Sequence, residues 1–307
     1  MTTSTPHGKG LVDTFQRIKE RTNGELEITH NLYIETPYKA TEALEIVRDG
    51  LVEIVEWNPI YYAGTYPFFG VPELPFLSPR LLSPAEMAKA ESEYWEVGAM
   101  GEALNRVLEE HSAVEVSTYF MEPSSFYFAG EVKSLADIEG KRLRVYSQPL
   151  GTLMMELGAT PVSITAPDVY SALQRGGLDG VITTPSTVEG LKWSEQMKSG
   201  FIVNLHAVKQ SQLVSKAKLD ALSPEVREIF LEEMQKFEAM TPGFADDNKV
   251  SYHKLMEEKG VTITTVSEEE YTKLHQIAKE RVWPAWVEQQ SQEVKDAYEA
   301  VLTLISK

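Results

Sequence analysis

Residues 140–192, GKRLRVYSQPLGTLMMELGATPVSITAPDVYSALQRGGLDGVITTPSTVEGLK, decide the fold of this chain. Short segments of strand-forming residues alternate in this run with segments whose apolar residues recur at helical spacing. Prolines stand where two of the helices are expected to begin, and glycines follow the helical segments. This alternation is typical of parallel crossover units and predicts an α/β fold. The expected elements are strands at 143–146, 161–165 and 178–183, and helices at 149–157, 169–175 and from 184 onward.

Two polar side chains lie near the ends of the strands expected in this run. Arg144 lies in the first strand among apolar neighbours, and Thr183 ends the last one. In an open parallel sheet, ligands bind beyond the carboxyl ends of the strands, where loops and helix N-termini present polar groups. A guanidinium donates two parallel hydrogen bonds to a carboxylate, so Arg144 is a candidate ligand-binding residue. A surface charge or an ion pair between strands is the alternative, and Arg142 is expected in solvent.

The composition limits the classes of function. A chain of 307 residues, 42% hydrophobic and 24% charged, is long enough and apolar enough for two globular domains. With 29 basic and 46 acidic residues the net charge is −17, which argues against binding to nucleic acid or anionic membranes. An anionic small ligand is still allowed, because one buried arginine sets the local potential more than the distant surface does.

Several chemistries lack the residues they need. There is no cysteine, which excludes disulfides and thiolate metal sites. The sequence contains no apolar run of about 18 residues, so it predicts no membrane-spanning helix. We find no glycine-rich phosphate loop and no nucleophile with an evident base. The histidines are scattered without metal-ligand spacing, at His7, His30, His111, His206, His253 and His275.

Several sequence motifs, which occur in a fixed order, cover most of the chain. Through these motifs the chain resembles the periplasmic substrate-binding proteins of tripartite ATP-independent periplasmic (TRAP) transporters, the DctP-like group. The resemblance implies an α/β, two-lobe periplasmic-binding-protein fold with discontinuous domains, mostly parallel sheets and a long helix spanning both lobes. The motifs are FQRIKERTNGELEI at 15–28, VRDGLV at 47–52, YYAGTYPFFGVPELPFL at 61–77, DIEGKRLRV at 137–145, LGATPV at 157–162, DVYSALQRGGLDG at 168–180 and TPST at 184–187.

Two segments are expected to cross between the lobes, at 114–120 and 201–208. They divide the chain into lobe I, residues 1–117 plus 207–245, and lobe II, residues 118–206 plus 246–307, with a ligand cleft between them. A long helical stretch from 224 to about 259 is broken or kinked at Pro242-Gly243. The other expected elements are helices at 11–21, 41–48, 84–111, 268–285 and 292–305, and strands at 25–29, 52–56, 126–128, 212–214 and 261–266.

The resemblance places the carboxylate-binding arginine of the family at Arg144. For Trp57, the alternative to ligand contact is packing in the core. For Glu56, the alternative is an exposed position at the rim of the cleft. The resemblance also implies that Met1–Ser4 are the stub of a first strand or that part of this strand has been removed. The predicted ligand-binding residues are Arg144, Trp57, Asn58, Ser147, Ala166, Thr183 and Phe126.

Three departures from the family pattern bear on the ligand. Thr183 replaces an asparagine that is common ahead of the proline-serine run, and Ala166 replaces an aromatic residue. A second arginine is missing near Pro123-Ser124-Ser125. These changes favour a monocarboxylate with a bulky or aromatic body, or a 2-oxo acid, over a sugar acid or a dicarboxylate held at both ends. Trp57, Phe126 and the space beside Ala166 would form the wall.

The resemblance implies a non-enzymatic solute-binding protein without a cofactor. It would capture an organic carboxylate in the periplasm, its export signal removed, and deliver it to the membrane permease subunits of a TRAP transporter. No nucleic-acid partner and no direct membrane insertion are expected. Two alternatives remain: a sensory protein that passes the same ligand to a receptor, and an enzyme with a dispersed cleft site acting on a small organic acid.

Overall fold

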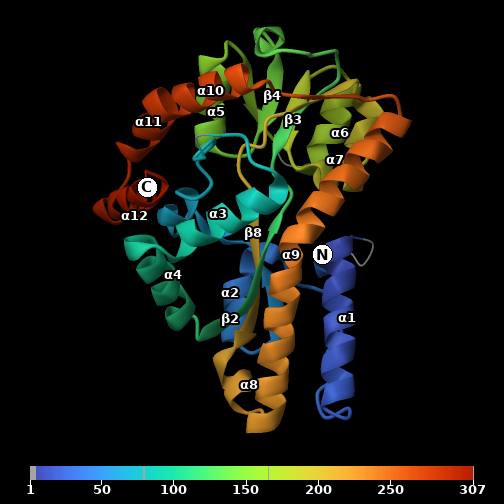
Figure 1. Cartoon of the computed structure of the whole chain (residues 1–307), viewed down its shortest axis with the longest axis vertical. Helices are drawn as coiled ribbons and strands as arrows, with labels where there is room; N and C mark the ends of the chain where they lie inside the picture. Colours follow the sequence, from blue (N-terminus) through green and yellow to red (C-terminus); the bar gives the residue numbers. More distant parts are fainter. Residues whose placement is uncertain (1–4, 79, 165, 307) are drawn as a thin grey trace.

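Two β-sheets organise the chain, one in each of two lobes (Figure 1). The computed structural model describes residues 5–78, 80–164 and 166–306. The first sheet has the strand order β1-β8-β2, and the second has the order β5-β4-β6-β3-β7-β9. The strands are β1 (Ile54–Trp57), β2 (Ala113–Met121), β3 (Ser125–Phe128), β4 (Arg142–Val145), β5 (Thr160–Ser163), β6 (Gly180–Thr183), β7 (Ser199–Ile202), β8 (Val208–Ser215) and β9 (Thr262–Thr265).

The six-stranded sheet confirms the predicted crossover units. Strand β4 pairs in parallel with β5 and β6, and β7 pairs in parallel with β9, while β3 lies antiparallel between β6 and β7. Helices α5 (Gln148–Glu156) and α6 (Ala166–Gln174) connect β4 to β5 and β5 to β6. Helix α7 (Pro185–Gly190) begins at the expected proline. Thr165, the expected end of the second strand in this run, lies outside the described residues.

The three-stranded sheet is antiparallel, so the predicted parallel arrangement holds for the other sheet only. Strand β8 pairs antiparallel with both β1 and β2. The chain leaves this lobe along β2 and returns to it along β8. Because the chain runs in opposite directions along these two neighbouring strands, they are antiparallel. The strand expected at 25–29 is not formed, because no described strand pairs with this segment. An extended segment becomes a strand only when a neighbour shares its hydrogen bonds.

The helix expected at 84–111 is two helices. Helix α3 (Pro84–Glu96) stops where Val97 adopts an extended conformation, and α4 (Gly98–Glu110) follows it. Gly98 has φ +47°, which a residue without a Cβ adopts at little cost and which a continuous helix does not allow. The other helices are α1 (Pro6–Arg21), α2 (Ala43–Arg48), α8 (Lys216–Asp220), α10 (Glu268–Ile277), which continues through a π-turn into α11 (Trp283–Val287), and α12 (Gln292–Ile305).

Helix α9 (Pro224–Glu258) is the long helix that spans both lobes. It packs on α1 and β2 in the first lobe and on α7 and β9 in the second. Pro242 lies inside it without ending it. A proline removes one backbone hydrogen bond and its ring pushes against the preceding turn, so the expected result is a kink. Figure 1 shows the helix bending as it passes between the lobes. No helix among residues 5–78, 80–164 and 166–306 is long and apolar enough to cross a membrane.

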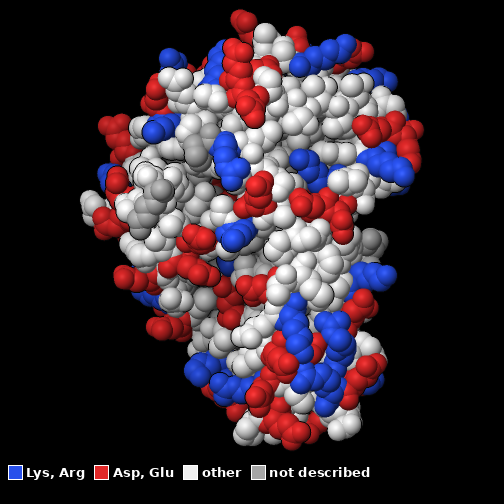
Figure 2. All heavy atoms as spheres, viewed as in Figure 1, with Lys and Arg blue, Asp and Glu red and all other residues white. Residues whose placement is uncertain are grey.

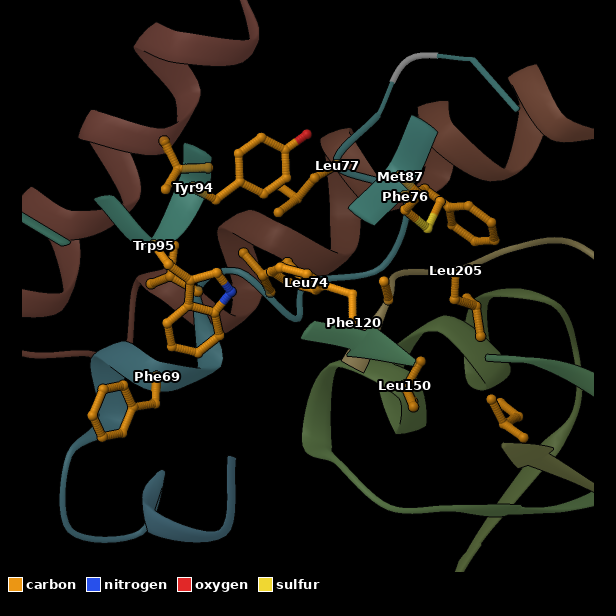
Figure 3. Packing of buried hydrophobic residues seen from close by; sticks show 14 of the residues in the cluster. Phe69, Leu74, Phe76, Leu77, Met87, Tyr94, Trp95, Phe120, Leu150 and Leu205 are labelled. Atoms are coloured by element: carbon orange, nitrogen blue, oxygen red, sulfur yellow. The ribbon is translucent and has the colours of Figure 1, made fainter. Parts of the chain in front are cut away.

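One hydrophobic core runs from the first lobe into the second. Figure 3 shows side chains from lobe I, among them Phe69 and Trp95, in the same cluster as Leu150 of α5 and Leu205. The opposite face of the six-stranded sheet has a separate core around Tyr127, Val181 and Trp193, to which side chains of α6 and α7 also contribute. A third core joins α1, α9 and β2. The lobes are therefore in apolar contact on one side of the second sheet.

Two extended segments link the two sheets, and these links lie next to each other. One joins β2 to β3, and the other joins β7 to β8. Ser124 N donates to His206 O at 3.1 Å, and Leu205 N donates to Ser124 O at 2.9 Å. These bonds hold the two links side by side, close to the segments predicted to cross between the lobes. The exact lobe boundaries stay a prediction. Helix α12 belongs to lobe II in the predicted division, but it packs on α4, which belongs to lobe I.

Candidate functional site

The register of the second sheet brings Arg144 and Thr183 to one face and one edge. Arg144 pairs with Val181 on β6, and Thr183 follows Val181 by two residues, so their side chains point to the same side. Arg144 lies one residue before the end of β4, and Thr183 is the last residue of β6. Both residues therefore lie at the carboxyl ends of parallel strands, as predicted from the sequence.

The Arg144 side chain is half-buried between two aromatic rings. Its guanidinium carbon lies 5.6 Å from the centre of the Tyr146 ring and 5.9 Å from that of Trp193. Its Nε donates a hydrogen bond to Ile164 O at 3.3 Å. Burial lowers the pKa of Arg144, but an arginine with so high an ordinary value stays protonated. The site thus holds a permanent, partly desolvated positive charge.

No described carboxylate forms an ion pair with Arg144. Apart from the exposed Arg175, every other arginine in the described part of the chain has such a partner within 4.0 Å. No described residue accepts a hydrogen bond from the terminal nitrogens of Arg144, and these nitrogens are not fully buried, so they reach solvent. Arg142 in contrast is exposed, as predicted, and pairs with Asp179. Arg144 is therefore a charge whose hydrogen-bond donors are open to an anion.

A hydrogen-bonded cluster lies beside Arg144. The Tyr146 hydroxyl is 2.8 Å from His206 Nε2 and 3.0 Å from Ser124 Oγ. His206 and Ser124 belong to the two links between the lobes and are buried. Sequence reasoning missed all three residues, as it missed Trp193. The position of Tyr146, two residues after Arg144 and just past the end of β4, was the one local signal. His206 is 60 residues away in sequence.

Trp57 and Phe126 do not form a wall around Arg144, which corrects the sequence-based hypothesis. Phe126 pairs with Ile182, whereas Arg144 is in register with Val181 and Tyr127, so Phe126 points to the opposite face of the sheet. Both aromatic side chains are 0% exposed and belong to the hydrophobic core that runs from the first lobe into the second. Trp57 packs against Tyr62 and Phe69, and its Nε1 has no hydrogen-bond partner among the described residues.

The remaining predicted residues divide between the lobes. Ser147 is the N-cap residue of α5 and Ala166 is the first residue of α6, shortly after the ends of β4 and β5, so they lie at the same sheet edge as Arg144, and both are half-buried. Asn58 follows β1 in the other sheet and is buried. Its Oδ1 accepts from Ile60 N at 3.1 Å and caps a short 3₁₀ turn. The structure therefore groups Arg144, Thr183, Ser147 and Ala166, while it assigns Asn58 a local structural bond.

Three buried carboxyl groups lie in or near the links. Glu122 Oε1 accepts from Ser186 N at 2.9 Å, and Glu91 Oε2 accepts from Ala207 N at 3.0 Å. Glu73 Oε1 has no partner among the described residues. Burial raises the pKa of each, that of Glu73 to about 8. Within the described ranges no group of three or more His, Asp or Glu side chains is placed to hold a metal ion.

Two cavities lie elsewhere in the molecule. A groove of about 760 Å³ follows the start of α9, and a cavity of about 400 Å³ lies between α1, residues 26–38 and β1. Neither is lined by Arg144. Figure 2 shows acidic and basic side chains interspersed over one face of the molecule. The candidate site is therefore defined by the accessible guanidinium and its neighbours at the sheet edge.

The two-lobe α/β fold, with its paired links and spanning helix, is that of a periplasmic binding protein. The model of the DctP family, bacterial extracellular solute-binding protein family 7, matches residues 1–290. The chain therefore belongs to this family of solute-binding proteins. This membership confirms the resemblance drawn from the sequence motifs.

Individual relatives are distant. A solute-binding protein of Albidiferax ferrireducens is 26% identical over 232 residues, 73% of this chain and 65% of the relative. The C4-dicarboxylate-binding periplasmic protein DctP of Rhodobacter capsulatus is 25% identical over 269 residues, 84% of this chain and 75% of that protein. The chain thus spans about two thirds of the length of the first of these relatives.

Among solved structures, the chain is similar to DctP7, an extracytoplasmic solute receptor of Bordetella pertussis that binds pyroglutamic acid. The TM-score is 0.78 at 21% identity, and the match covers 98% of this chain and 96% of the receptor. At this identity the likeness establishes the fold.

Proposed function

We propose that this chain is an extracytoplasmic solute-binding protein that binds an organic carboxylate through Arg144 and delivers it to the membrane permease of a TRAP transporter. One observation carries this proposal. Arg144 is half-buried at the carboxyl ends of the parallel strands, and its terminal nitrogens reach solvent without a carboxylate partner. Family membership supports the transport role, since the family consists of solute-binding proteins.

We infer that the ligand is a monocarboxylate with a bulky or aromatic body, or a 2-oxo acid. The absence of a second arginine supports this inference, since Ser124 and Ser125 are buried and hydrogen-bonded at the place where one was expected. The rings of Tyr146 and Trp193 supply flat apolar surface beside the guanidinium. Relatives in this fold include receptors for pyroglutamic acid and orotic acid, both ring monocarboxylates, and others for malonate and D-glucuronate.

A ligand screen tests this proposal. Thermal unfolding is measured with single compounds from four groups: aryl monocarboxylates and pyroglutamate, 2-oxo acids, succinate and malonate, and sialic and glucuronic acids. Because a ligand that binds only the folded protein raises its stability, at least one compound of the first two groups should raise the melting temperature. Calorimetry then gives the dissociation constant. Stabilisation by succinate or sialic acid, with none by an aryl or 2-oxo monocarboxylate, would refute the inferred ligand class.

Ala166 offers a test of the space beside the site. It begins α6 at the same sheet edge as Arg144 and is half-buried against the core around Tyr127 and Val181, and we propose that the space beside its methyl group belongs to the site. We expect Ala166→Phe to weaken binding of a large aryl carboxylate by about tenfold or more and to leave a small 2-oxo acid within about twofold. Calorimetry with one ligand of each size measures the difference. An equal loss for both ligands would contradict the proposed space.

A further inference from the structure

The orientation of the Arg144 guanidinium depends on two rings that are held very differently. Trp193 is 1% exposed and is packed in the core around Tyr127 and Val181. The Tyr146 ring is half-buried, so packing alone restrains it less. Its hydroxyl is fixed instead by hydrogen bonds to His206 and Ser124. The Tyr146 side of the guanidinium is therefore held by polar contacts.

The contacts of His206 determine which of its nitrogens carries the proton. Nδ1 lies 3.1 Å from Ala207 O, which can only accept, so Nδ1 must be the donor. Burial lowers the pKa of His206 to about 4, which keeps the ring neutral at pH 7. Nε2 is then an acceptor, and the Tyr146 hydroxyl donates to it at 2.8 Å. The same hydroxyl is also the donor to Ser124 Oγ at 3.0 Å, so the single phenol proton is shared between His206 Nε2 and Ser124 Oγ.

His206 is itself attached to the backbone of both links and to lobe I. Its carbonyl accepts from Ser124 N, and the next residue, Ala207, donates its N–H to Glu91 Oε2 on α3. The side chain is 2% exposed. The Tyr146 hydroxyl is thus bonded to a buried segment whose backbone is hydrogen-bonded on both sides.

We propose that Tyr146 is a positioning residue for the anion-binding Arg144, and that His206 holds Tyr146 in place. The inference rests on the proposed function of Arg144. A carboxylate takes two parallel hydrogen bonds only if the guanidinium plane has the correct orientation, and an arginine that is free to rotate must be ordered when the ligand binds. Loss of the phenol-imidazole bond therefore weakens binding through Arg144, without any contact between Tyr146 and the ligand.

The chain provides a matched control. Tyr127 lies on β3, which is separated from β4 by β6, and its hydroxyl is 3.3 Å from His253 Nε2. Tyr127→Phe therefore breaks a second tyrosine-histidine pair in the same sheet, and this pair forms no hydrogen bond or cation-π contact with Arg144 among the described residues. Tyr146→Phe keeps the ring beside Arg144 and removes the hydroxyl. His206→Gln removes the imidazole that accepts the same hydrogen bond from Tyr146.

The first measurement is the dissociation constant of the best carboxylate from the screen. We expect Tyr146→Phe and His206→Gln each to weaken binding about fivefold to tenfold, and the double variant to be no weaker than the stronger single effect. Tyr127→Phe should stay within about twofold. In an Arg144→Lys background, Tyr146→Phe should add less than about twofold. A full Tyr146→Phe loss in that background would assign the hydroxyl to direct ligand contact and overturn the proposal.

The second measurement needs no ligand. In protein labelled with ¹⁵N-arginine, the Nε–H signal of Arg144 is identified by its absence in Arg144→Lys. Its hydrogen exchange should be slow in the wild type and in Tyr127→Phe and clearly faster in Tyr146→Phe. Equal exchange in the wild type and Tyr146→Phe would overturn the proposal, even if His206→Gln fails to fold. If the wild type binds no carboxylate, the proposed function fails, and this measurement still decides whether Tyr146 positions Arg144.

Discussion

Replacing Arg144 with alanine should weaken the binding of an organic carboxylate by roughly 3 to 4 kcal/mol, a few hundredfold in the dissociation constant. The guanidinium is half-buried, and no described residue accepts from its terminal nitrogens, so a ligand carboxylate would supply their partners. Without the arginine, a carboxylate at this sheet edge would lose its water without gaining a counter-charge. Calorimetry with the best ligand from the screen measures the loss.

Arg175 is the control for Arg144→Ala. It follows α6, is exposed and, like Arg144, has no ion pair with a described carboxylate. Arg175→Ala removes the same charge from the molecule and should leave affinity unchanged. Arg144→Lys should fall between the wild type and Arg144→Ala, because an ammonium keeps the charge and loses the planar pair of donors. Unchanged affinity in Arg144→Ala would remove this arginine from the site.

Glu73→Gln should stabilise the protein by roughly 3 kcal/mol at pH 7. Burial raises the pKa of Glu73 to about 8 in the folded chain, against an ordinary value of 4.5. Below pH 4.5 the carboxyl is protonated in both the folded and the unfolded chain, so the substitution changes little. As the pH rises toward 8, the unfolded chain releases a proton that the folded chain retains, and the wild type loses stability. Glutamine has no proton to release.

Urea unfolding at a series of pH values measures this effect. The difference in the free energy of unfolding between Glu73→Gln and the wild type should be near zero at pH 4 and grow up to about pH 8. Glu299→Gln, an exposed residue of α12, removes the same charge and should show no such trend. A Glu73→Gln variant less stable than the wild type at pH 7 would mean that the folded protein holds this carboxylate charged and paired.

Features with local causes could be predicted from the sequence. The crossover units at 143–183 follow from apolar spacing and from prolines at helix starts, and α12 begins and ends at the predicted residues. Arg144 could be proposed as a ligand-binding residue because the family resemblance places its carboxylate-binding arginine at this position, and this role stays a prediction. The kink in α9 follows from Pro242, whose effect on the backbone is the same in any helix.

Features that depend on distant partners could not be predicted in the same way. Residues 25–29 have strand-like composition, but a strand needs a neighbour, and no described strand pairs with them. Phe126 and Tyr127 are adjacent aromatic residues, and only the register of β3 with β6 shows that Tyr127 shares the face of Arg144. The bond between Tyr146 and His206 arises where a strand end meets a link that the chain enters 60 residues later.

The hydrogen bonds between the two links at Ser124, Leu205 and His206 have a mechanical consequence. Two separate flexible tethers would let the halves swing and twist independently, whereas strands bonded side by side can deform only together. Helix α9 is a third connection that packs on both halves, so swinging and twisting are restricted further. If the halves close on an anion, as proposed, fewer relative orientations have to be frozen, which lowers the entropic penalty of closure.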